Sequence, residues 1–158
     1  MKPVLVIGLG NSLMGDDGVG CAVAERLAAE ARLPESMELI SGGTDLLRYA
    51  GQMAGRERVV IIDAIQVDAE PGNVIALDAA DLSLDTRQDH AHHLSAIQAI
   101  RLLEMTTPAQ FRLVGISIGS AGMDASLSPV LAARMPAILG RVLHELGCHS
   151  PESDAGTT

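Results

Sequence analysis

The chain has 158 residues, of which 47% are apolar, so it has the size of one ordinary domain and enough apolar side chains to bury a core. Its net charge is −9 and it has no extended cluster of Lys or Arg, which argues against a nucleic-acid partner because phosphate neutralisation dominates such binding. No apolar stretch reaches the length of a membrane span, and the run near the N-terminus is too short for a secretory signal. We therefore expect a cytoplasmic protein with a single α/β domain over residues 1–148 and a polar, disordered tail over 149–158.

The pattern along the chain alternates between strands and helices. Strands are predicted from short apolar runs ended by turn residues, and helices from apolar residues three and four positions apart. In chain order, we predict strand 4–7, helix 19–32, strand 37–40, a short helix capped by Thr44 or Asp45 and ending near residue 53, strand 59–62, strand 74–77, helix 92–104, strand 111–118 and a last helix that begins near Ser128. Pro136 should kink the last helix or shift its start, and Gly147 should end it.

This alternation predicts an α/β fold, a three-layer sandwich in which a mainly parallel, twisted sheet of about five strands carries helices on both faces. In such sheets, ligands bind beyond the carboxyl ends of the strands. Asp17 follows the first predicted strand, Gly43 follows the second, and Asp63 ends the third. These three positions should therefore lie together at one edge of the sheet, although they are far apart in the sequence.

The loop after the first strand, "GLGNSLMGDDGVG", has the glycines of a phosphate-binding loop but lacks its other features. A dinucleotide-binding GxGxxG needs glycine where Leu13 stands, and a Walker A loop needs a GK[ST] ending that is absent. Asp16 and Asp17 would also repel a phosphate at the start of the following helix. One Asp is enough to cap a helix, so we expect Asp16 to cap the helix or shape the loop, and Asp17 to meet a cation.

Asp63 and a group of histidines extend this candidate cation site. Asp63 follows a run of β-branched apolar residues, and a carboxylate buried there costs several kcal/mol unless it is paired, hydrogen-bonded or bound to a metal. His90, His92 and His93 stand at the start of a predicted helix, and each is either part of a solvated loop or able to reach the same edge of the sheet. One imidazole with two carboxylates suits a first-row divalent metal that keeps open positions.

Other catalytic chemistries find little support in the sequence. The chain has no HExxH, no cysteine pair at metal-binding spacing and no GxSxG, so nucleophilic-triad chemistry is not favoured. Cys21 and Cys148 are far apart and form no CxxC, and we expect both to be free thiols in a reducing compartment.

Four motifs occur in a fixed order: "GLGNSLMGDDGVG", "SGGTD" after the second strand, "IIDAI" at the third, and "HxL" opening a later helix. Together they resemble the nickel–iron hydrogenase maturation endopeptidases, over nearly the whole chain. That family cleaves a C-terminal extension from the precursor of the hydrogenase large subunit after nickel has entered the precursor. The resemblance implies a catalytic and metal-binding set made of Asp17, Asp63 and His92, because His92 has the apolar Leu94 two positions later.

Three protein ligands leave positions of a metal open, so we expect Asp17, Asp63 and His92 to form an incomplete coordination shell. Our hypothesis is that the nickel comes with the substrate rather than staying bound as a cofactor, and no nucleotide is expected. Gly42, Gly43 and Thr44 match the loop beside the family's site and are expected to contact the substrate. The segment "GISIGSAGMDAS" lacks the turn with Pro and Glu found in many members, which leaves open which isoenzyme's precursor is processed.

Two other functions fit parts of the sequence. Peptidyl-tRNA hydrolases share an opening like "VIGLGN", but they continue with Pro-Gly, carry a His soon afterwards and have basic residues for tRNA, unlike this acidic chain. A metal-dependent chaperone that binds the precursor without cutting it would have the same ligand set. A shortened product on a gel separates cleavage from such binding.

Overall fold

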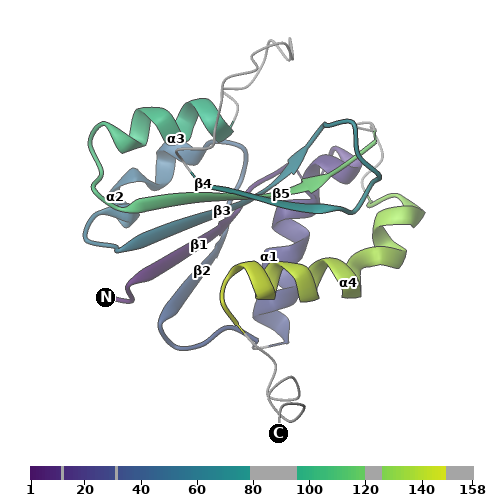
Figure 1. Ribbon diagram of the computed structural model, residues 1–158, viewed down its shortest axis with the longest axis horizontal. Coiled ribbons are helices and arrows are strands. Elements are labelled where there is room, and N and C mark those ends of the chain that lie inside the picture. Colours follow the sequence, from purple (N-terminus) through teal and green to yellow (C-terminus); the bar gives the residue numbers. More distant parts are fainter. Residues whose placement is uncertain (12, 31, 79–95, 120–125, 149–158) are drawn as a thin grey trace, which may run out of the picture.

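The sheet has five strands in the order β2-β1-β3-β5-β4, and helices cover both of its faces (Figure 1). The computed structural model describes residues 1–11, 13–30, 32–78, 96–119 and 126–148. In chain order its elements are β1 (Val4–Gly8), the 3₁₀-helix η1 (Gly15–Gly18), α1 (Val19–Ala29), β2 (Met37–Ser41), the 3₁₀-helix η2 (Leu46–Tyr49), α2 (Ala50–Met53), β3 (Arg58–Ile65), β4 (Val74–Asp78), α3 (Ala96–Glu104), β5 (Gln110–Ser117) and α4 (Pro129–Glu145). The pairs are parallel except for β4 with β5, which confirms the predicted α/β fold with a mainly parallel sheet.

The apolar strands bury side chains on both faces of the sheet. Along β1, Val6 packs in the cluster formed with α1 and α4, whereas Leu5 and Ile7 pack in the cluster formed with η2, α2 and α3. Figure 1 shows the same division, with α1 and α4 on one side of the sheet and α2 and α3 on the other. A continuous apolar run is typical of such a strand because neither of its faces meets water.

The third strand is longer than the sequence predicted. β3 continues to Ile65, so the expectation that the strand stops at Asp63 is wrong. On one side of β3, the pairing with β1 ends where Gly8 lies opposite Ile62; on the other side, β5 pairs with β3 as far as Ile65, and Gly115 lies opposite Asp63. Asp63 therefore stands at a step in the sheet, where one neighbouring strand has ended and the other still holds the backbone.

The boundaries of the first helices follow local signals. α1 ends at Ala29, three residues before the predicted end. Asp45, rather than Thr44, caps the short helical stretch after β2, because its Oδ1 accepts a hydrogen bond from the backbone N–H of Leu47 at 3.1 Å. Of the helix predicted at 92–104, residues 96–104 belong to the described part of the chain, where they form α3.

The last helix begins where it was predicted to begin. Ser128 is its N-cap, and its Oγ accepts from the backbone N–H of Leu131 at 3.4 Å. Pro136 lies inside α4 and does not shift its start. The chain leaves the helix at Gly147, whose N–H donates to the carbonyl of His144 at 3.0 Å. The predicted tail over 149–158 lies outside the described residues.

Two glycines let α1 and the first loop press against the ends of the strands. A Cβ on Gly20 would overlap the carbonyl oxygens of Leu9 and Ile62, so the first turn of α1 can contact the sheet only without a side chain there. Gly10 has a φ of +144°, and a Cβ at this position would overlap the carbonyl oxygen of Asp17. These contacts hold Asp17 close to the carboxyl ends of β1 and β3.

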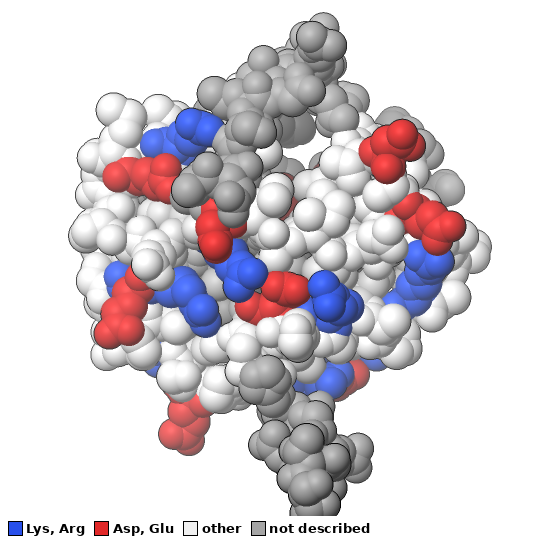
Figure 2. Space-filling model, in the orientation of Figure 1, with Lys and Arg blue, Asp and Glu red and all other residues white. Residues whose placement is uncertain are grey.

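Charges of both signs cover the surface despite the net charge of −9. Figure 2 shows acidic and basic side chains next to one another on the face in view. Exposed pairs such as Arg26–Glu30, at 3.2 Å, contribute little to stability because water and salt screen them. In the part of the chain that the structure describes, no helix combines the length and the apolar character needed to cross a membrane.

Candidate active site

Asp17 lies in η1, directly before α1, and is partly exposed. Its Oδ2 accepts a hydrogen bond from the backbone N–H of Asn11 at 3.2 Å, which ties the carboxylate to the glycine loop. The side chain of Asn11 shapes the same loop, because its Oδ1 accepts from the N–H of Leu13 at 3.0 Å. This loop therefore presents Asp17 at the edge of the sheet with one carboxylate oxygen held in place.

Asp16 has a different role from its neighbour. It is buried, with 8% of its surface exposed, and its Oδ1 accepts from the backbone N–H of Ser128 at 2.6 Å. No side chain caps α1, whose N-cap is Gly18, so the expectation that Asp16 caps this helix is wrong. Its contact with Ser128 instead joins η1 to the start of α4. Asp16 therefore shapes the loop, which was the other role predicted for it.

Asp63 is the described carboxyl group whose acidity the fold changes most clearly. Burial raises the pKa of Asp63 to about 7; the negative charge of Asp17 adds to this effect, and a hydrogen bond from the N–H of Ala64 to Oδ1, at 2.8 Å, opposes it. Asp17 and Asp63 are thus close enough to influence each other. Near neutral pH, Asp63 is poised between its acid and its carboxylate forms.

The loops after β1 and β2 are joined by backbone hydrogen bonds. The N–H of Gly42 donates to the carbonyl of Gly8 at 2.7 Å, and the N–H of Gly10 donates to the carbonyl of Gly43 at 3.1 Å. A pocket of about 370 Å³ lies between the two loops. Gly42, Gly43 and Thr44, the predicted substrate loop, all line it.

Cys21 also lines this pocket, and the sequence interpretation treated it only as a free thiol. Both it and Cys148 are indeed free. The Sγ of Cys21 lies 2.7 Å from the carbonyl oxygen of Gly42 and 3.4 Å from that of Gly10, so it contacts both loops. Burial raises the pKa of the Cys21 thiol, which keeps it protonated and able to donate. One signal was present in the sequence: Cys21 directly follows Gly20, which we placed at the start of a helix leaving the glycine loop.

The structure brings Asp17, Asp63 and the loop 42–44 to the carboxyl edge of the sheet, as the strand order predicts. Within the described ranges, no three side chains of His, Cys, Asp or Glu form a group that could hold a metal ion. His92, the predicted third ligand, and its two neighbouring candidates lie outside those ranges. Two nearby carboxyl groups, one of them with its pKa raised to about 7, are able to exchange a proton or to share a cation.

Known proteins share this sequence pattern. Residues 21–145 match the family model HycI, described as hydrogenase maturation protease. The chain belongs to the hydrogenase maturation protease family. This maturation protease is a hydrolase, an endopeptidase that processes a hydrogenase precursor. Membership in this protease family therefore excludes the two alternative functions, a peptidyl-tRNA hydrolase and a non-cleaving chaperone.

Individual relatives of the maturation protease support the same assignment. The chain is 31% identical over 147 residues to the hydrogenase 2 maturation protease of Escherichia coli K12, a match that covers 90% of each chain. The solved structure of the hydrogenase maturating endopeptidase HybD from E. coli superposes with a TM-score of 0.73, over 90% of this chain and 91% of that one. The [NiFe] hydrogenase maturation protease HycI from Thermococcus kodakarensis, 25% identical, gives a TM-score of 0.75 over the same shares.

Proposed function

We propose that this protease removes the C-terminal extension of the large-subunit precursor of a [NiFe] hydrogenase, in the cytoplasm, and that it recognises the nickel already seated in that precursor. The observation that carries the proposal is the pair Asp17 and Asp63 at the edge of the sheet, with the pKa of Asp63 raised to about 7. Burial and a second carboxylate both make the charged form of Asp63 unfavourable. A divalent cation brought by the substrate would relieve both effects at once.

This arrangement supports a metal that is supplied by the substrate. Two carboxylates alone leave most positions of a first-row metal open, and His92 is proposed to supply one more ligand. An ion that is already held by the precursor completes its shell with these side chains when the two proteins meet. A precursor without nickel then lacks a binding partner for the protease carboxylates, and specificity follows from that missing contact.

Two roles for the carboxylates in the cleavage step fit the geometry. In one, the nickel polarises the scissile carbonyl or the attacking water while Asp17 and Asp63 hold the ion. In the other, Asp63 removes a proton from the attacking water, for which a pKa near the working pH is well suited. Gly42, Gly43 and Thr44 line the pocket beside these groups and are proposed to contact the chain around the cleaved bond.

The recognition of nickel is tested with two forms of the same precursor. The purified protease is incubated with nickel-loaded and nickel-free precursor, and the shortened product is followed on a gel and by mass spectrometry. We expect cleavage of the loaded form only, with the rate for the free form lower by about 100-fold or more, because the ion supplies the contact on which recognition depends. Equal cleavage of both forms would overturn the nickel-recognition proposal. No cleavage of the loaded form would overturn the proposed protease substrate itself.

His92 is tested against its two neighbours. We expect His92→Ala to abolish processing, while His90→Ala and His93→Ala retain at least about half of the activity, because neither is expected to belong to the ligand set. Processing rates are measured alongside thermal unfolding, so that a folding defect is separated from a lost ligand. Full activity in His92→Ala would show that another group completes the site.

A further inference from the structure

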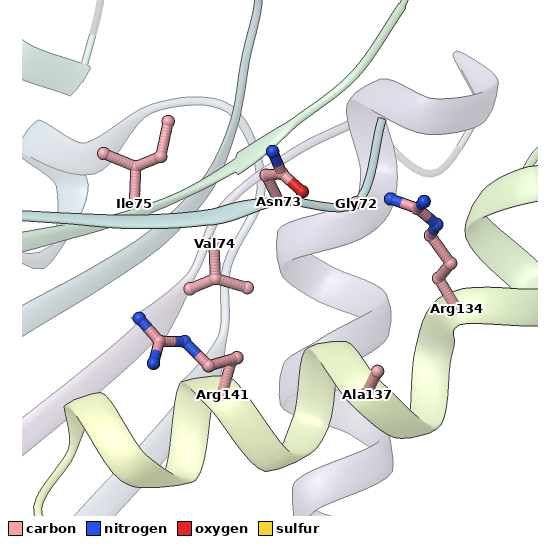
Figure 3. Close-up of a pocket in the computed structure, with 7 residues that line it drawn as sticks. All are labelled: Gly72, Asn73, Val74, Ile75, Arg134, Ala137 and Arg141. Carbon is pink, nitrogen blue, oxygen red and sulfur yellow. The ribbon is translucent and has the colours of Figure 1, made fainter. Parts of the chain in front are cut away.

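A second pocket, of about 410 Å³, lies between the edge strand β4 and helix α4. Figure 3 shows Arg134 and Arg141 extending from α4 toward β4, with the small side chain of Ala137 between them. The two arginines are seven residues apart, which places them about 10 Å apart on one side of the helix. In a chain with a net charge of −9, this pocket is lined by two arginines and, among the described residues, by no acidic side chain.

The contacts of the arginines hold their guanidinium groups at the pocket. Nη1 of Arg134 donates to the carbonyl of Pro71 at 2.7 Å, and Nη2 pairs with the exposed Glu70 at 3.2 Å. The stem of Arg134 passes close to the turn at Gly72, where a Cβ would lie 2.7 Å from its Cδ. A glycine at this position therefore permits the arginine to reach the turn.

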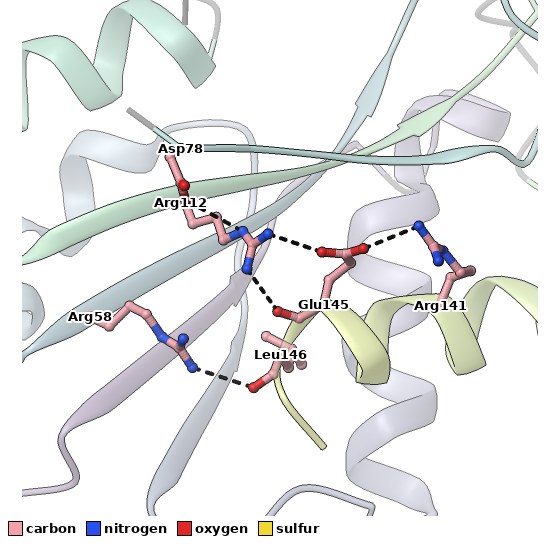
Figure 4. A network of polar contacts seen from close by, with 6 residues as sticks. All are labelled: Arg58, Asp78, Arg112, Arg141, Glu145 and Leu146. Carbon is pink, nitrogen blue, oxygen red and sulfur yellow. Dashed lines mark hydrogen bonds and ion pairs between the residues drawn. The ribbon is translucent and has the colours of Figure 1, made fainter. Parts of the chain in front are cut away.

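Arg141 shares its acidic partner with another arginine. Its Nη2 lies 3.2 Å from Oε1 of Glu145, while Oε2 of the same carboxylate is 3.0 Å from Nη2 of Arg112 (Figure 4). Glu145 is thus shared between two cations, and Arg112 also pairs with Asp78, with 3.6 Å between its Nε and Oδ1 of that carboxylate. The side chain of Arg141 is 58% exposed, so its remaining donors are accessible to a ligand.

Within the described residues, the strand beside these arginines has no partner on its outer edge. β4 is the last strand in the sheet order and, in the described part of the chain, it pairs only with β5. An unpaired strand edge offers a row of backbone N–H and C=O groups to an extended peptide, which binds by adding a further strand. Such a peptide would have every second side chain on the side of α4, where the two arginines lie.

This edge is close to the candidate active site. Asp63 lies opposite Gly115, and Gly115 lies opposite Ile75, so one row across the sheet connects the site with the start of β4. Two strand spacings separate the backbones of Asp63 and Ile75 by about 10 Å. A chain paired to the edge of β4 lies one spacing farther out, about 14 Å from Asp63, so about four to five extended residues would connect that edge with the site.

We infer that the edge of β4, with Arg134 and Arg141, is a docking site for an extended acidic segment of the precursor, separate from the residues that meet the nickel. The inference rests on the proposed function for the identity of the partner. The ligand chemistry is a peptide in extended form with carboxylates on alternate residues. Backbone hydrogen bonds to β4 supply affinity, and the arginines select for negative charge.

The test measures binding without cleavage. A fluorescein-labelled peptide of alternating Glu and Val is titrated with the full-length protein, and fluorescence anisotropy reports the affinity; a peptide of alternating Lys and Val is the charge-reversed probe. The variant is Arg134→Gln with Arg141→Gln, since glutamine keeps a donor but removes the charge. The matched control is Arg26→Gln with Arg32→Gln, two surface arginines that both pair with Glu30.

We expect the Glu–Val peptide to bind the native protein and the control variant equally, and to bind the Arg134/Arg141 variant at least about tenfold more weakly. The Lys–Val peptide should bind none of them. Equal affinity of the native protein for both peptides, or an unchanged affinity in the Arg134/Arg141 variant, would overturn the docking site. Since no bond is cut, these outcomes are independent of the nickel experiment, which tests the proposed function alone. Thermal unfolding confirms that each variant is folded.

Discussion

Replacing Asp63 with Asn is expected to abolish processing and, at the same time, to stabilise the folded protein above pH 7. The folded-state pKa of Asp63, about 7, lies above its ordinary value of 3.8, so the folded protein binds this proton more tightly than the unfolded chain does. The stability that protonation contributes is fully present below pH 3.8 and is lost as the pH rises through about 7. Asparagine is never charged and still has an Oδ1 that accepts from the N–H of Ala64. The free energy of unfolding of the variant therefore does not fall as the pH rises through about 7 on account of this residue.

The measurement is chemical denaturation at two pH values. We expect the free energy of unfolding of Asp63→Asn to exceed that of the native protein by roughly 2–4 kcal/mol at pH 8, and the difference to shrink toward zero near pH 4. Asp68→Asn, an exposed residue in the loop after β3, is the matched control and should change neither stability nor processing. A difference of the same size at both pH values would contradict the burial of a charged Asp63 as its cause.

Substitutions at the neighbouring residues Asp16 and Asp17 are expected to have different effects, the first on the stability of the fold and the second on processing. Asp16→Ala leaves the N–H of Ser128 without its partner in a partly buried contact, so we expect a loss of about 1–2 kcal/mol in the free energy of unfolding and substantial remaining activity at a temperature where the protein stays folded. Asp17→Asn keeps the shape of the side chain and the loop bond from Asn11 but removes the charge. We expect it to lower processing by about 100-fold or more with little effect on stability.

Both variants are compared with the native protein by urea denaturation and by processing of the nickel-loaded precursor. Asp16→Asn is the milder partner of Asp16→Ala, because its amide oxygen still accepts from Ser128, and it should recover most of the lost stability. The assignment of roles would be wrong if Asp16→Ala were as stable as the native protein but inactive. It would also be wrong if Asp17→Asn processed the precursor at the native rate.

The sequence alone predicted the layered fold and the placement of most of the candidate site. Apolar runs and helical spacing are local signals, and a parallel sheet brings the carboxyl ends of its strands to one edge, so Asp17, Asp63 and the loop at Gly43 could be placed together from their order along the chain. His92 was selected from a motif, and it remains a prediction because it lies outside the described residues. The substrate loop was selected from a motif in the same way, and the structure places it beside the pocket.

Other features were decided only by the tertiary structure, because they depend on contacts between residues that are far apart in the sequence and follow no regular spacing. Asp16 meets Ser128 across 112 positions, so its local pattern suggested a helix cap instead. The continuation of β3 past Asp63 depends on pairing with β5, which is formed much later in the chain. Cys21 gained its contacts because two separate loops fold around it, and Arg134 and Arg141 line a pocket because α4 packs beside β4. Local periodicity determines which elements form, whereas packing between distant elements determines which side chains meet.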